Sequence, residues 1–106
     1  MQIQLNSDSS VAFNQSVSEE TEAILRGQLD RFASHLTRLE VHLSDVNAER
    51  GGGDDKRCLL EARPAGRDPV VATHDGPSIA LATRGAAQKM NRLLNSLFGR
   101  LENKQS

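Results

Sequence analysis

The cations of the last third of the chain are the side chains best suited to binding a charged partner. Segment 76–101 has no acidic residue, and its cations are Arg84, Lys89, Arg92 and Arg100. The whole chain of 106 residues has a formal charge of −1, so this segment concentrates positive charge in a protein without an excess of it. Cations interspersed with amide side chains suit a phosphate backbone, because the cations supply affinity and the amides add contacts without repulsion.

The same residues can also form an ordinary solvated helix exterior, with cations near the C-terminal end favoured by the helix dipole. Arg84 lies in the first half of the predicted helix, so the dipole does not explain it. The sequence has three Phe and no Trp or Tyr, which leaves few rings for stacking on unpaired bases. If nucleic acid is the partner, structured RNA is therefore favoured over single strands.

Other chemistry finds little support in the residue spacing. The candidate metal ligands lie far apart in the sequence: His35, His42, His74 and Cys58. Neighbouring strands can bring two of these histidines together, but surface or packing roles are favoured over a metal site. Asp54 and Asp55 lie beside a glycine run, a poor place for pre-organised acid–base catalysis. We therefore expect no enzyme activity, no cofactor and no metal.

Size and composition predict one small, soluble domain over residues 1–106. The single cysteine excludes an internal disulfide, which fits a reducing compartment. The chain begins with an alternating "MQIQL" rather than a signal peptide, and no apolar run approaches the length needed to span a bilayer. We expect a cytoplasmic protein without a membrane or small-molecule partner.

Apolar spacing predicts the elements of the first half. Alternation over residues 1–6 predicts a strand with one apolar face. A helix follows, capped by Ser16 or Ser18, with Glu19, Glu20 and Glu22 in its first turn. Its apolar residues recur at intervals of four, three and four: Leu25, Leu29, Phe32 and Leu36.

Alternation predicts three more strands, over 38–44, 57–63 and 70–74. Cys58 shares a face of the middle one with Leu60 and Ala62, so we expect a small core residue rather than a reactive thiolate. Residues 47–56, which include three glycines, are expected to form a flexible hairpin loop. The fold class is therefore α+β in the order β-α-β-β-β-α, a two-layer sandwich with both helices on one face of a four-stranded sheet.

The final helix is predicted from about Ser78 to Leu101, with residues 102–106 frayed. Its expected apolar stripe is Ile79, Ala82, Ala86, Met90, Leu93, Leu97 and Leu101. Arg84 and Arg92 are eight residues apart and are expected to project to roughly the same side, with Lys89 and Arg100 at the border of the stripe. The amides and hydroxyl expected to fill the gaps between the cations are those of Asn91, Asn95 and Ser96.

The stretch "VVATHDGPSIALATRGAAQKMNRLL" resembles the signature of the ribosome hibernation-promoting factor family, also called ribosome-associated inhibitors, sigma-54 modulation proteins or ribosomal subunit interface proteins. In that family the last strand turns at a glycine into a helix of the form Asp-x-Tyr-Ala-Ala-Ile-Asp, followed by Lys-Leu-x-x-Gln-Leu. The positions matching this pattern are Val70, Ala72, Gly76, Ser78, Ala80 to Ala82, Lys89-Met90 and Leu93-Leu94. The segments "MQIQL" and "FASHLTRLEVHL" are also similar.

The resemblance implies a fold like that of double-stranded-RNA-binding domains. It also implies docking between the head and body of the small ribosomal subunit, where basic residues of both helices grip ribosomal RNA and obstruct the sites for messenger and transfer RNA. Such a protein silences translation under stress and needs no chemistry. By position, Lys89, Arg92 and Arg31 fall on basic positions of the family. The expected RNA-binding residues are thus Arg31, Arg84, Lys89, Arg92 and Arg100.

Several positions depart from the family pattern. Ala80 replaces the family tyrosine, Ser78 the first aspartate and Arg84 the second acid. The first predicted helix is net acidic, and the basic C-terminal end common in the family is missing. These differences leave open an alternative function, a protein-interaction module on the same fold that has lost RNA binding.

Overall fold

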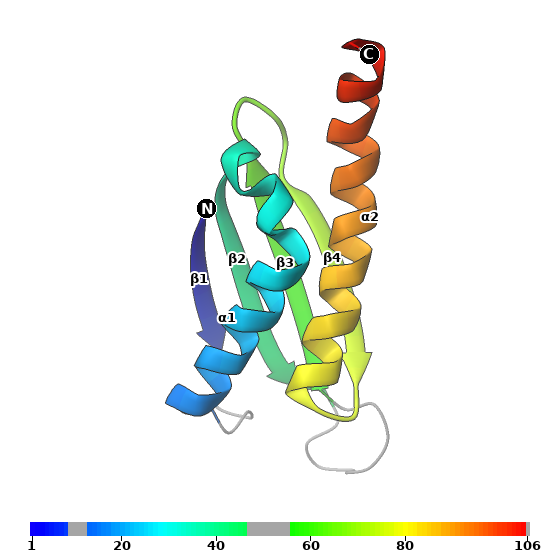
Figure 1. The fold of residues 1–106 in the computed structure, drawn as a ribbon. Helices are drawn as coiled ribbons and strands as arrows, with labels where there is room; N and C mark the ends of the chain where they lie inside the picture. Colours follow the sequence, from blue (N-terminus) through cyan, green and yellow to red (C-terminus); the bar gives the residue numbers. More distant parts are fainter. Residues whose placement is uncertain (9–12, 47–55, 106) are drawn as a thin grey trace.

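The computed structural model describes residues 1–8, 13–46 and 56–105, and beyond Phe98 it describes the backbone only. One sheet carries a layer of helices on one of its faces (Figure 1). The elements, in chain order, are β1 (Gln2–Ser7), α1 (Gln15–Leu29), the 3₁₀ helix η1 (Asp30–His35), β2 (Leu36–Asp45), β3 (Lys56–Pro64), β4 (Val70–Gly76) and α2 (Ile79–Gln105). This confirms the predicted α+β sandwich. Of the predicted loop 47–56, only Lys56 lies within the described residues, as the first residue of β3.

The four strands follow the sequence order β1-β2-β3-β4 across the sheet. β1 pairs parallel to β2, with Ile3 opposite Leu39, because α1 and η1 carry the chain back between them. The other two pairings are antiparallel, with Leu60 between Val41 on one side and Ala72 on the other. β1 and β4 therefore form the two edges of the described sheet.

The core lies between the sheet and the helices. The alternation seen in the sequence places Cys58, Leu60 and Ala62 on the helix side of β3, where all three are fully buried. This confirms Cys58 as a core residue. The same face of β2 contributes the buried residues Leu39, Val41 and Leu43. Because Ala side chains dominate the start of α2, this helix can lie close to β3 and β4.

The first helix begins earlier than the sequence analysis predicted. Asn14, not Ser16 or Ser18, is the N-cap, and its side-chain oxygen accepts a hydrogen bond from the Val17 backbone N–H at 2.9 Å. Asn ranks among the strongest N-cap residues. Because the helix starts at Gln15, its first turn contains no acid. The prediction that glutamates occupy the first turn of this helix was therefore wrong.

The end of the first helix also differs from the expectation. α1 stops at Leu29, and the tighter η1 carries the chain to His35, so that Leu36 opens β2. The predicted apolar residues are nonetheless all buried, with Phe32 2% and Leu36 4% exposed. A 3₁₀ turn has three residues per turn, and this tightening keeps Phe32 directed at the core.

The final helix begins at Ile79, close to the predicted start at Ser78, and the Ser78 hydroxyl accepts a hydrogen bond from the Leu81 N–H at 3.2 Å. Its buried residues are Ala82, Thr83, Ala86, Ala87, Met90, Leu94 and Phe98. Leu93, assigned to the stripe from the sequence, is 44% exposed, and Leu94 occupies the core instead. The Leu101 side chain lies outside the described residues, and the helix itself continues past Leu101 to Gln105.

Candidate nucleic-acid interface

The predicted cations of α2 lie on two different sides of the helix. Arg84 lines a cavity of about 440 Å³ against α1, together with Glu20 and Gly27. Lys89 and Arg92 line a cavity of about 480 Å³ against β4. The expectation that Arg84 and Arg92 share one side was therefore wrong. Eight residues turn an α-helix about 80° beyond two full turns, enough to place the two guanidinium groups on opposite borders of the exposed surface.

Arg31 reaches the same layer from η1. Its Nη2 donates a hydrogen bond to Asn95 Oδ1 of α2 at 3.0 Å, and its guanidinium carbon lies 4.8 Å from the centre of the Phe32 ring. These contacts hold the exposed guanidinium group beside the turn of α2 that carries Arg92. The structure thus brings together Arg31 and Asn95 from segments far apart in the sequence. The side chain of Arg100 lies outside the described residues.

Two of the polar residues expected to contact phosphates also make hydrogen bonds within the fold. Asn91 Nδ2 donates to the Gln28 carbonyl of α1 at 2.6 Å, and this contact joins the two helices. Lys89 Nζ donates to the Thr73 carbonyl of β4 at 2.9 Å, so the ammonium group is not fully solvated as the helical pattern implied. Both contacts depend on tertiary placement, which spacing along one helix cannot reveal.

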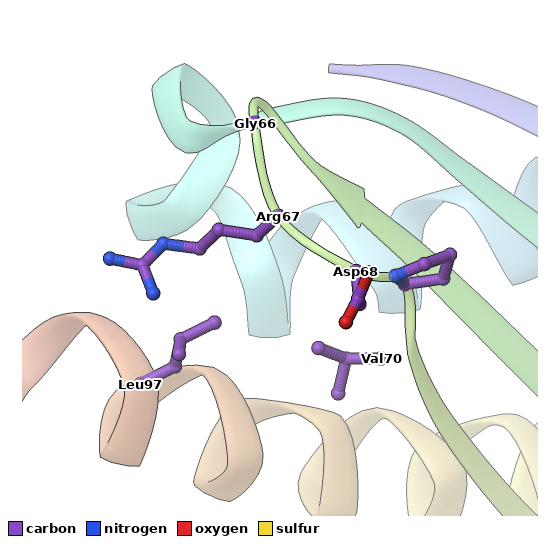
Figure 2. A pocket seen from close by; sticks show the side chains of 6 residues that line it. Gly66, Arg67, Asp68, Val70 and Leu97 are labelled. Carbon is purple, nitrogen blue, oxygen red and sulfur yellow. The ribbon is translucent and has the colours of Figure 1, made fainter.

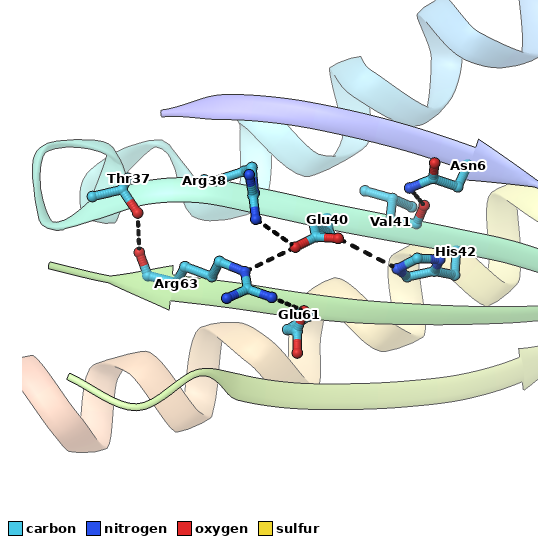
Figure 3. A network of polar contacts seen from close by, with 8 residues as sticks. All are labelled: Asn6, Thr37, Arg38, Glu40, Val41, His42, Glu61 and Arg63. Carbon is cyan, nitrogen blue, oxygen red and sulfur yellow. Dashed lines mark hydrogen bonds and ion pairs between the residues drawn. The ribbon is translucent and has the colours of Figure 1, made fainter.

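The cations of the open sheet face have carboxylate partners. Arg63 donates to Glu40 at 2.8 Å and to Glu61 at 2.9 Å, and Arg38 also donates to Glu40, at 3.0 Å (Figure 3). The hydrogen bond from Arg63, assisted by the charge of Arg38, lowers the pKa of Glu40 below its ordinary value, despite a partly opposing desolvation effect. The carboxylate therefore stays charged and neutralises the arginines around it. On the same face, Arg57 donates to Asp75 at 2.8 Å.

The helical layer differs in its charge pairing. Within the described residues its one ion pair joins Arg26 to Glu22 at 2.9 Å on α1. The guanidinium groups of Arg31, Arg84 and Arg92 form no ion pair there, although all three residues are exposed. Lys89 lies close enough to Asp75 to contribute slightly to the lowered pKa of that carboxyl, whose main cause is the hydrogen bond from Arg57. Positive charge is thus available to a partner on the helices and largely neutralised on the sheet.

Sequence reasoning missed a group of residues at the end of the sandwich where η1, the β3–β4 turn and α2 meet. The His35 ring stacks on Phe98 with centres 4.6 Å apart, and the guanidinium carbon of Arg67 lies 5.9 Å from the same ring. Arg67 extends from the turn toward α2 (Figure 2). The "PAGRDP" turn marks the position of Arg67 along the chain, but its approach to Phe98 depends on the fold.

Cys58 and the histidines do not form a chemical site. Burial raises the pKa of the Cys58 thiol to about 11, although the neighbouring Thr83 hydroxyl partly opposes this effect, so the nucleophilic thiolate is disfavoured. His42 is exposed on the open face beside Glu40, whereas His74 packs against Gly85 on the helix side. In the segments that the structure describes, no three His, Cys, Asp or Glu side chains form a potential metal site.

A third cavity has a volume of about 670 Å³ and is lined by Gly66, Arg67, Asp68, Pro69, Val70 and Leu97 (Figure 2). Its lining residues include one cation, Arg67, and one carboxylate, Asp68. Covalent catalysis requires a nucleophile beside a base, and these lining residues do not provide that pair. No helix among the described residues is long and apolar enough to cross a membrane.

Two solved structures resemble this arrangement closely. One, a ribosomal subunit interface protein from Coxiella burnetii, superposes with a TM-score of 0.75 at 14% identity, over 93% of this chain and 99% of the other. The other, the N-terminal domain of Protein Y from Thermus thermophilus, gives a TM-score of 0.72 at 15% identity, over 92% and 99%. The chain has the fold of a ribosomal subunit interface protein.

The resemblance noted in the sequence is therefore confirmed at the level of the fold. No family model matches the sequence, and a search of curated proteins found no match. At 14% and 15% identity, the shared property is the path of the backbone. On this fold, the surface of η1 and α2 presents the arginines Arg31, Arg84 and Arg92, which form no ion pair among the described residues.

Proposed function

We propose that this protein associates with the ribosome by placing its helical layer against ribosomal RNA of the small subunit. There it would occlude the channel for messenger and transfer RNA and silence translation, a cytoplasmic role without chemistry. Two findings support the proposal: the fold shared with a ribosomal subunit interface protein and the resemblance of the 70–94 segment to that family. The observation that carries it is the difference in charge pairing between the helices and the sheet.

An arginine without an ion-pair partner binds a phosphate more favourably than a paired one, because no carboxylate has to be displaced first. Arg31 and Arg92 are exposed, and the hydrogen bond with Asn95 places Arg31 beside α2, three residues along that helix from Arg92. Each phosphate contact releases condensed counterions, which makes the affinity depend on salt. We infer that this end of the layer makes the principal RNA contact.

The acids of α1 limit how the RNA can lie. Glu19 and Glu20 are exposed near the start of α1, and Glu20 lines the same cavity as Arg84. A phosphate placed over Arg84 would also approach this carboxylate, so Arg84 is expected to contribute less than Arg92. The acidic start of α1 would then face away from the RNA backbone.

Sedimentation with purified small subunits and whole ribosomes at low and moderate salt tests the proposal. The wild-type protein should sediment with the small subunit at low salt, and the double substitution Arg31→Glu and Arg92→Glu should release it. Arg38→Glu with Arg57→Glu makes the same change in net charge on the open sheet face and should leave binding in place. Circular dichroism checks that both variants are folded.

Two results would contradict the proposal. The first is absence of the wild-type protein from all ribosomal fractions at low salt. The second is equal release of the two charge-reversed variants, because binding would then depend on net charge and not on the surface around Arg92.

A further inference from the structure

The outer side of β4 is an open sheet edge. In the described sheet β4 pairs only with β3. The Thr73 carbonyl points away from β3, because it accepts the hydrogen bond from Lys89 Nζ at 2.9 Å. Strand geometry repeats every two residues, so the backbone N–H and C=O groups of Val71 face the same open side. A strand of another molecule can pair with these groups.

A groove runs along this edge between β4 and α2. One part, of about 480 Å³, is lined by Val71, Ala72 and Thr73 and by Lys89, Arg92, Leu93 and Ser96. The other, of about 670 Å³, is lined by residues 66–70 and Leu97 (Figure 2). On the strand side, Val70 of the second part directly precedes Val71 of the first. On the helix side, Leu97 of the second part directly follows Ser96 of the first, so the two parts adjoin each other.

Exposed aliphatic side chains border the groove. Val71 is 51% exposed and Leu93 is 44% exposed. Among the described residues, four large apolar side chains are exposed to solvent, and Val71 and Leu93 are two of them. They lie on opposite borders, Val71 on the strand and Leu93 on the helix. Phosphate recognition has no use for such side chains, whereas they contribute most to burial when a peptide binds.

The charges around the groove are mainly positive. Lys89 and Arg92 line the part beside Thr73, and Arg67 lies at the other end. The one acid among the lining residues of the two cavities is Asp68. An occupant with acidic side chains would complement this potential, and opposite charges across an interface raise both the rate and the specificity of association.

We propose that this groove binds an extended acidic peptide segment of a partner protein, which adds to the sheet as a fifth strand beside β4. Alternate side chains of an added strand point to opposite faces. Acidic side chains on the helix side would meet Lys89 and Arg92, and apolar side chains on the other side would lie beside Val71. The Lys89 ammonium would exchange the Thr73 carbonyl for a peptide carboxylate, and this exchange would free the carbonyl to accept a peptide N–H.

A second copy of the chain fits the groove less well. Pairing two β4 strands about a two-fold axis would bring the cationic borders of both copies, with Lys89 and Arg92, toward each other. Like charges at an interface oppose association. The bond between Lys89 and Thr73 also covers one carbonyl of the edge in the free protein, which is a known means of protecting an edge strand from self-pairing.

NMR titration of the 106-residue chain tests the inference. The probe is an acetylated and amidated octapeptide that alternates valine and glutamate. We expect chemical-shift changes concentrated at Val71 to Thr73 and at Lys89 to Leu97. Replacing each glutamate with glutamine, or methylating alternate backbone nitrogens, should weaken binding about tenfold or more, because the first removes the charge and the second the strand pairing.

The substitution Leu93→Ser should weaken peptide binding roughly tenfold without unfolding the protein, since this side chain is 44% exposed. Leu81→Ser is the matched control, because Leu81 is also exposed, at 51%, but lies outside the groove. Any sedimentation of the protein with ribosomes should persist in Leu93→Ser, because Leu93 is not a proposed RNA contact. The experiments can therefore contradict the peptide site and the ribosome proposal independently.

Three outcomes would overturn the inference. One is the absence of shift changes at millimolar peptide. Another is that a single-stranded oligouridylate, and not the peptide, perturbs these residues, which would make the groove part of an RNA site. The third is a dependence of the same resonances on protein concentration without peptide, which would identify a second copy as the occupant.

Discussion

The imidazole ring of His74 in β4 lies against the backbone of Gly85 in α2, where a Cβ atom would overlap it. This contact joins the last strand to the last helix shortly after the turn that connects them. Glycine in a helix interior is about 1 kcal/mol less favourable than alanine. Packing against His74 therefore requires a residue without a side chain at position 85, although glycine is unfavourable within a helix.

Gly85→Ala should destabilise the protein, although alanine is the better helix former. The added methyl group would force the His74 ring or the helix to move, and overpacking of this kind costs about 1–3 kcal/mol. The improved helix propensity offsets part of this cost. Urea unfolding followed by circular dichroism should show a lower midpoint with an unchanged slope.

Gly27 in α1 provides the matched control, because a Cβ atom there would have no neighbour within 4 Å. Gly27→Ala should stabilise the protein by about 0.5–1 kcal/mol. Combining Gly85→Ala with His74→Ala should remove the steric overlap and recover part of the lost stability. If Gly85→Ala alone stabilised the protein as Gly27→Ala does, the proposed packing constraint would be wrong.

The alternation and spacing of apolar residues were sufficient to predict the architecture. Each strand has one apolar face, and packing both helical stripes on the same face of one sheet buries all of these apolar residues together. Local detail was less predictable. Asn14, Ser16 and Ser18 are all able to cap a helix, and the spacing from Leu25 to Leu36 fits a continuous helix as well as the helix, 3₁₀ turn and strand that form.

The candidate site was predictable only in composition. The acid-free segment identifies Arg84 and Arg92, but helical rotation decides that one faces α1 and the other β4. The choice between Leu93 and Leu94 for the core depends on the same rotation. The Asn91 contact with Gln28 and the stacking of His35 on Phe98 join residues that lie far apart in the sequence. Sequence spacing contains no signal for them.

The buried thiol of Cys58 predicts a loss of stability in alkaline solution. Burial raises its pKa from 9.0 to about 11, so the thiol ionises in the unfolded chain before it does in the folded protein. Stability should be full below pH 9 and should fall by about 2–3 kcal/mol as the pH rises to 11. Urea unfolding at several pH values measures this loss, and Cys58→Ala should reduce it. An equal loss in Cys58→Ala would assign the effect to other groups.

The open sheet face predicts a loss of stability in acid. Arg63 and Arg38 hold the pKa of Glu40 below its ordinary value of 4.5. The ion pairs of Glu40 therefore contribute fully to stability above pH 4.5. This contribution is lost as the pH falls through the lowered pKa that Glu40 has in the folded protein. Glu40→Gln should lower stability at neutral pH and flatten its dependence on pH below 4.5. Thermal unfolding at several pH values measures the stability at neutral pH and its dependence on pH. If the loss of stability below pH 4.5 were the same in Glu40→Gln as in the wild type, Glu40 would not be the titrating group.

The proposed ribosome contact predicts unequal effects of neutralising different arginines. Each phosphate contact contributes about 0.7–0.9 to the slope of log affinity against log salt, so Arg92→Gln should reduce this slope by roughly that amount. Arg84→Gln should reduce it less, because Glu20 borders Arg84 in the same cavity. Arg57→Gln, on the neutralised sheet face, should leave the slope unchanged. Sedimentation binding curves at four salt concentrations would measure these slopes. Equal slopes for all three variants would mean that Arg92 contacts no phosphate and that binding, if present, uses another surface.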